Sequence, residues 1–112
     1  MIEKIILDNL KQGLNIPCFF IYPKDDKITE FVIIEKTGSG KNNHLINSTF
    51  TFQSYSKSVY DAVILNEKVK KEVENLIKLN EISRIELNSD YNFTDEERKK
   101  HRYQAVFDIY HY

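Results

Sequence analysis

The sequence contains one cysteine, two prolines, three glycines and no tryptophan in 112 residues. A single cysteine excludes an internal disulfide and is typical of proteins that fold in a reducing compartment. With so few prolines and glycines there is no linker-like stretch, so we expect one domain over residues 1–112. No run of about 18 apolar residues is present, and no transmembrane helix is predicted.

The sequence also lacks a large excess of charge of either sign, because 16 basic and 17 acidic residues give a formal net charge of −1. Proteins that bind nucleic acid through its phosphates usually carry a basic excess. We therefore expect no specific nucleic-acid binding and no membrane partner. The N-terminal residues carry Glu3 and Asp8 within an apolar stretch, which does not fit a signal peptide.

The most informative stretch covers residues 47–80, where the side-chain period changes from two to about 3.6. In residues 47–55, Phe50 and Phe52 share one face of a predicted strand. The amphipathic helix that follows has Ser58 as its expected N-cap. Its predicted apolar stripe consists of Ala62, Leu65, Val69, Val73, Leu76 and Ile77.

The same patterns assign the rest of the chain to a helix and four further strands. The expected helix covers residues 2–14, and the expected strands cover residues 17–22, 31–36, 82–88 and 102–112, with a polar loop at 37–45. The order is α-β-β-β-α-β-β, and the short connections favour a mostly antiparallel sheet. We predict an α+β fold in which this sheet packs against two helices.

The sequence contains only weak matches to motifs for catalysis or ligand binding. Gly38 to Lys41 suggests a phosphate loop, but Glu35 and Asn42 occupy the positions where that motif needs glycine and a hydroxyl residue. A hairpin connection is favoured there. Cys18 lies in an apolar segment and is interpreted as a core residue. No set of nucleophile, base and oxyanion donors emerges, so we predict no enzyme activity, no catalytic residues, no cofactor and no metal site.

A basic cluster at residues 98–102, from Arg98 to Arg102, adjoins Tyr103. Its acidic neighbours at 95–97 favour a solvated surface with internal ion pairs. The alternative is a small binding module for nucleic acid or a protein partner, which would use this cluster and nearby tyrosines through stacking and phosphate contacts.

The seven tyrosines and seven phenylalanines are many for this length. Tyrosine is enriched in protein interfaces, so tyrosines on the sheet face opposite the predicted core suggest a contact surface. Ordinary partial exposure is the alternative. The interface candidates on strands are Thr49, Thr51, Gln53, Tyr55, Tyr110 and Tyr112. Those in the predicted loop are Lys41, Asn42 and Asn43.

Three segments, residues 30–38, 51–62 and 102–109, carry a resemblance to a known group of proteins. With the element order and the length, they resemble the tail terminator and head-tail joining (tail-completion) proteins of long-tailed bacteriophages. In particular, the chain resembles prophage tail proteins from low-GC Gram-positive bacteria. The resemblance spans nearly the whole chain, and its motifs are patterns of packing.

The resemblance implies a non-enzymatic virion protein of the tail, present in the host cytoplasm during assembly. Members of this group form a homo-oligomeric ring, usually a hexamer, at the head-proximal end of the tail tube. The expected partners are therefore copies of the same chain, the tail tube protein and the head connector protein. The loop at residues 37–45 is the expected contact with the tube.

Overall fold

The computed structural model describes residues 1–42 and 44–112, and its elements follow the predicted order α-β-β-β-α-β-β. The fold is α+β, as the sequence predicts. The described part of the chain contains the helices α1 (Ile2–Leu14) and α2 (Val59–Asn75) and the short 3-10 helix η1 (Leu76–Lys78). Its strands are β1 (Cys18–Phe19), β2 (Phe31–Asn42), β3 (Leu45–Ser56), β4 (Ile82–Asn92) and β5 (His101–His111).

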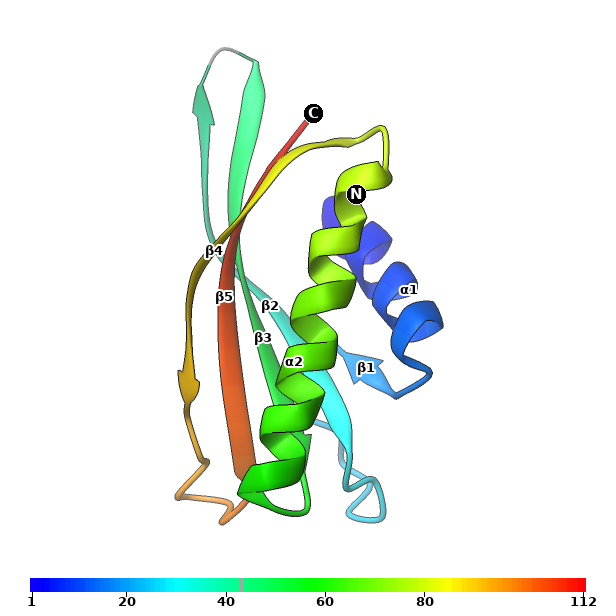
Figure 1. The fold of residues 1–112 in the computed structure, drawn as a ribbon, viewed down its shortest axis with the longest axis vertical. Helices are drawn as coiled ribbons and strands as arrows, with labels where there is room; N and C mark the ends of the chain where they lie inside the picture. Colours follow the sequence, from blue (N-terminus) through cyan, green and yellow to red (C-terminus); the bar gives the residue numbers. More distant parts are fainter. Residues whose placement is uncertain (43) are drawn as a thin grey trace.

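The strands form one sheet in the order β1-β2-β3-β5-β4. All neighbouring pairs are antiparallel except β1 and β2, which are parallel. The connection between β3 and β5 runs through α2 and β4, so the last strand of the chain lies between β3 and β4 (Figure 1). The molecule is elongated, with extents of 43 × 24 × 23 Å. The end of β2 and the start of β3 lie together at one end of the long axis (Figure 1).

Both helices pack on one face of the sheet, because the apolar side chains of both elements gather there. Phe50 and Phe52 of β3 lie with Phe107 of β5 beneath α2, and all three are fully buried. The buried side of α2 consists of Ala62, Leu65, Asn66, Val69 and Val73, and α1 adds Ile6, Leu7 and Leu10. The prediction that the sheet packs against two helices is therefore confirmed, with Phe50 and Phe52 on the face that the helices cover.

Local signals set the limits of the helices. Ser58 has extended backbone angles, and its hydroxyl accepts the backbone N–H of Asp61 at 3.1 Å, which makes it the predicted N-cap of α2. Asn15 ends α1 in the left-handed conformation with φ of 55°, and its N–H bonds the carbonyl of Lys11.

The sequence predicts a polar loop at residues 37–45. For the described residues this prediction is wrong, because β2 continues to Asn42 and β3 begins at Leu45. Glycine and serine disfavour strands when considered alone. Here the ladder continues regardless, with Gly38 opposite Thr49 and a register shift between Lys36 and Gly38. Pairing with β3 overrides the weak local preference.

The limits of other elements also differ from the prediction. The strand expected at 17–22 is reduced to β1, and β4 continues to Asn92 past a register shift between Leu87 and Ser89. Ile77 is half exposed, although the helical stripe predicted its burial. The helix tightens into η1 after Asn75, which changes the rotation per residue and turns Ile77 outward.

Candidate functional site

The sheet face away from the helices carries a ladder of polar side chains. Gln53 on β3 donates from Nε2 to Oε1 of Gln104 on β5 at 2.9 Å. Gln104 in turn donates from its own Nε2 to the hydroxyl of Tyr91 on β4 at 2.5 Å. These bonds join three neighbouring strands across the sheet. The two amides are thus held in one arrangement by hydrogen bonds within the chain.

A second polar group on this face centres on Asp108 of β5. The hydroxyl of Thr49 donates to Oδ1 at 2.8 Å, and the amide of Asn88 donates to Oδ2 at 3.2 Å. Thr51 lies between the two groups and is buried. The predicted candidates Thr49, Thr51 and Gln53 therefore do share the face opposite the core.

Tyr55 lies on the same face but does not offer surface to a partner, which corrects its selection as a contact residue. Its ring stacks on Phe31 with centroids 4.6 Å apart and meets Tyr22 edge-on at 5.5 Å. With Ile33 these residues form a second small core, which the segment at 20–30 helps to cover. Burial raises the pKa of Tyr55, although the nearby Arg102 charge opposes the change.

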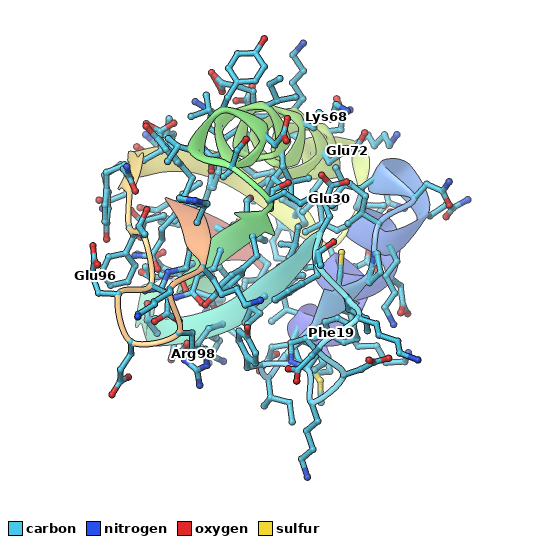
Figure 2. All side chains as sticks on the ribbon, turned by 90° about the horizontal axis from the view of Figure 1, so that it is seen from below. Phe19, Glu30, Lys68, Glu72, Glu96 and Arg98 are labelled. Atoms are coloured by element: carbon cyan, nitrogen blue, oxygen red, sulfur yellow. The ribbon has the colours of Figure 1, made fainter. Side chains whose placement is uncertain are left out.

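The arginines of the predicted basic cluster are held by the chain itself. The Arg102 guanidinium donates to the Tyr55 hydroxyl at 2.8 Å and lies over the Phe93 ring at 4.2 Å. The Arg98 guanidinium lies over Tyr22 at 4.3 Å. Figure 2 shows Arg98 on the side of the sheet away from α2. These arginines therefore brace the second core, and phosphate binding would have to compete with those contacts.

Asp95 connects both arginines. It is buried, and it accepts hydrogen bonds from the backbone N–H and the guanidinium of Arg98, each at 3.1 Å. Its carboxylate also lies 3.9 Å from Arg102. Burial alone would raise the pKa of Asp95, but the bonds from Arg98 and the two positive charges outweigh it and hold that pKa below its usual value.

The remaining candidates lie toward the other end of the molecule. Tyr110 is half-buried beneath the Arg84 guanidinium, 5.5 Å from its ring centre, whereas Tyr112 is 74% exposed. Lys41 is exposed on β2 close to the hairpin turn. Asn42 ends β2, and Asn43 lies outside the described residues. The candidates are thus divided between the open face and the hairpin end.

Sequence reasoning missed the two open edges of the sheet. β4 is an edge strand along its whole length. At the other edge, β1 pairs only with Val32 and Ile33, so the rest of β2 has no outer partner strand among the described residues. No local signal gives the order of strands in a sheet, so these edges become visible only in the structure.

Two exposed apolar side chains lie beside the β4 edge on the helix side of the sheet. Leu87 is 46% exposed and Ile77 is 50% exposed. With Glu74, Ile85 and Phe107 they line a hollow of about 280 Å³.

A serine–histidine pair was also missed, because its members are 63 residues apart. Ser48 Oγ lies 2.8 Å from Nε2 of His111, and the histidine Nδ1 lies 3.3 Å from the Tyr112 carbonyl. Nucleophilic chemistry needs an accessible hydroxyl. Ser48 has no exposed surface and His111 is buried, so the pair satisfies two buried polar groups and cannot meet a substrate in this conformation.

Burial also limits the reactivity of the single cysteine. Cys18 is buried, as predicted, and burial raises the pKa of its thiol to about 11. Among the described residues no three histidine, cysteine or acidic side chains are grouped to hold a metal ion. Within the same residues, no helix is long and apolar enough to span a membrane.

Comparison with known proteins adds no family. No protein-family model matches this chain, and no curated protein matches its sequence.

Proposed function

We propose that this chain is a non-enzymatic phage structural protein that caps the tail tube and joins it to the head connector as a ring of identical subunits. The observation that carries the proposal is the α-β-β-β-α-β-β order, in one sheet covered on a single face by two helices. This is the order on which the resemblance to tail-completion proteins rests.

The shape of the molecule suits a ring subunit. Its long axis is 43 Å, and the β2–β3 hairpin lies at one end of it, with the 20–30 and 93–100 segments at the other (Figure 1). Subunits placed side by side around a tube would present all their hairpins to one side. The hairpin end then contacts the tail tube, and the opposite end faces the connector.

Binding to tail tubes tests this function. The probe is the tube formed by the major tail protein from the genome that encodes this chain, and the readout is co-sedimentation. We expect the chain to sediment with tubes and the exposed hairpin variant Lys41→Glu to bind at least about tenfold more weakly.

The matched control is Lys24→Glu, which makes the same charge change at an exposed site in the 20–30 segment, at the far end of the molecule (Figure 1). It should bind tubes as the unmodified chain does. A chain that neither self-associates nor binds tubes would contradict the proposed function. Equal loss in both lysine variants would contradict the assignment of the hairpin.

A further inference from the structure

The two open edges of the sheet run in opposite directions. Three successive antiparallel pairs, β2–β3, β3–β5 and β5–β4, make β2 and β4 antiparallel to each other. A copy rotated about an axis along the strands would bring its β2 beside β4 with its helices on the same face. The new pair would then be antiparallel, which is the more stable kind of pairing.

The lengths of the two edges also match. β4 has 11 residues, and β2 has 12, of which β1 pairs with two. An edge this long presents a row of backbone N–H and C=O groups that water alone satisfies in the single chain. Adding a strand would satisfy them with backbone partners.

Apolar side chains lie near both edges. Beside β4 lie the exposed Leu87 and Ile77, with Glu74 at the margin of their hollow. A second hollow of about 370 Å³ reaches β2 at Lys36, and its lining extends from Met1, Ile2 and Ile5 across Ile46 to Glu81 and Tyr112. Leu87 and Ile77 would therefore meet the apolar side chains of Met1, Ile2 and Ile5.

We propose that the β4 edge of one copy pairs with the β2 edge of the next copy, with Leu87 entering the apolar surface near Met1. This inference rests on the proposed ring, and it names the surfaces that build it. The contact is head-to-tail, so each added copy leaves one open edge until the ring closes. The continuous sheet then has no open edge.

Both edges carry features that restrain premature pairing. A register shift interrupts β2 between Lys36 and Gly38, and two interrupt β4, between Ile82 and Arg84 and between Leu87 and Ser89. Bulges and charged side chains are the usual means by which proteins protect open edges. Pairing is therefore expected to be weak in solution and to need high concentration or a template.

Directed cross-linking tests the contact. One variant carries Asn88→Cys on β4, where the side chain is exposed, and the other carries Gly38→Cys on β2, where an added Cβ meets nothing within 4 Å. The two are mixed at the highest soluble concentration with a short bis-maleimide. The natural Cys18 is buried and its pKa is raised to about 11, so its background reaction is low.

We expect the mixture to give cross-linked dimers at least about tenfold above the level of a Tyr60→Cys control, which places an exposed thiol on α2. Either cysteine variant alone should give cross-linked dimers only at the control level. Introducing Leu87→Lys into the Asn88→Cys variant should return the yield of the mixture to that level. A mixture no better than the control would overturn the proposal. Cross-linking of Asn88→Cys with itself would overturn it in favour of a two-fold β4–β4 contact.

The result is separable from that of the tube-binding experiment. A chain that binds tubes without the mixed cross-link would overturn the edge pairing and leave the proposed function standing. A chain that gives the mixed cross-link without binding tubes would retain the edge pairing and remove the tail function.

Discussion

At the scale of single residues, the most constrained group is the set around Asp95. Its carboxylate is buried between Arg98 and Arg102, and Arg102 continues the contacts to Tyr55. A buried carboxylate that accepts charged hydrogen bonds contributes most when it is ionised. The set therefore fixes the 93–100 segment to the second small core.

This constraint predicts how stability depends on pH. The pKa of Asp95 is lower in the folded chain than the ordinary value of 3.8 for this carboxyl group. Its contribution is therefore present above that value and is lost as pH falls through the lower folded pKa. Asp95→Asn should lower the free energy of unfolding by about 1–3 kcal/mol at about pH 7, measured by urea titration.

The difference between Asp95→Asn and the unmodified chain should shrink as pH falls below the folded pKa. Glu96→Gln, at an exposed neighbouring position, is the control and should change the free energy of unfolding by less than about 0.5 kcal/mol. A difference that stays constant with pH would show that the ionised form of Asp95 is not the stabilising one.

For single residues, the sequence correctly predicts which face of a strand a side chain lies on. It does not predict whether another segment of the chain covers that side chain. Strict alternation along β3 correctly separates Phe50 and Phe52 from Thr49 and Gln53. It also puts Tyr55 on the open face, but it cannot show that the 20–30 segment covers that end. Cover by a distant segment depends on tertiary packing, which no local period encodes.

At the scale of elements, the unit of β3 and α2 holds the fold together. Phe52 is fully buried, with its ring 5.8 Å from that of Phe107 in an edge-to-face arrangement. Phe52→Ala would leave a cavity beneath α2. We expect a loss of about 3–5 kcal/mol in the free energy of unfolding, measured by denaturant titration.

The control for this substitution is Tyr60→Ala on the exposed side of α2, where the side chain is 73% exposed. It should cost less than about 0.5 kcal/mol. Similar losses in the two variants would contradict the assignment of the core to the inner face of α2.

Elements with a strong period were predictable from the sequence, and elements held only by pairing were not. The apolar spacing of α1 and α2 and the cap at Ser58 carry local information. The outer half of β2 contains Gly38 and Gly40 and has no such signal, yet it pairs with β3 throughout. The open-face candidates could thus be found from alternation, whereas the hairpin appeared as a loop.

At the scale of the whole molecule, the arrangement that matters is the strand order. Among the described residues it leaves β4 and most of β2 open at opposite edges. The sequence contains both strands but not their places in the sheet, because the order is decided by which long-range pairs form. The proposed ring contact was accordingly beyond sequence reasoning.

The most direct test of the proposed function is the length of tail tubes, measured by electron microscopy. The major tail protein from the genome that encodes this chain is allowed to polymerise with and without the chain. The account predicts shorter tubes in the presence of the chain, with added ring density at one end. Tubes of unchanged length with bare ends would contradict it.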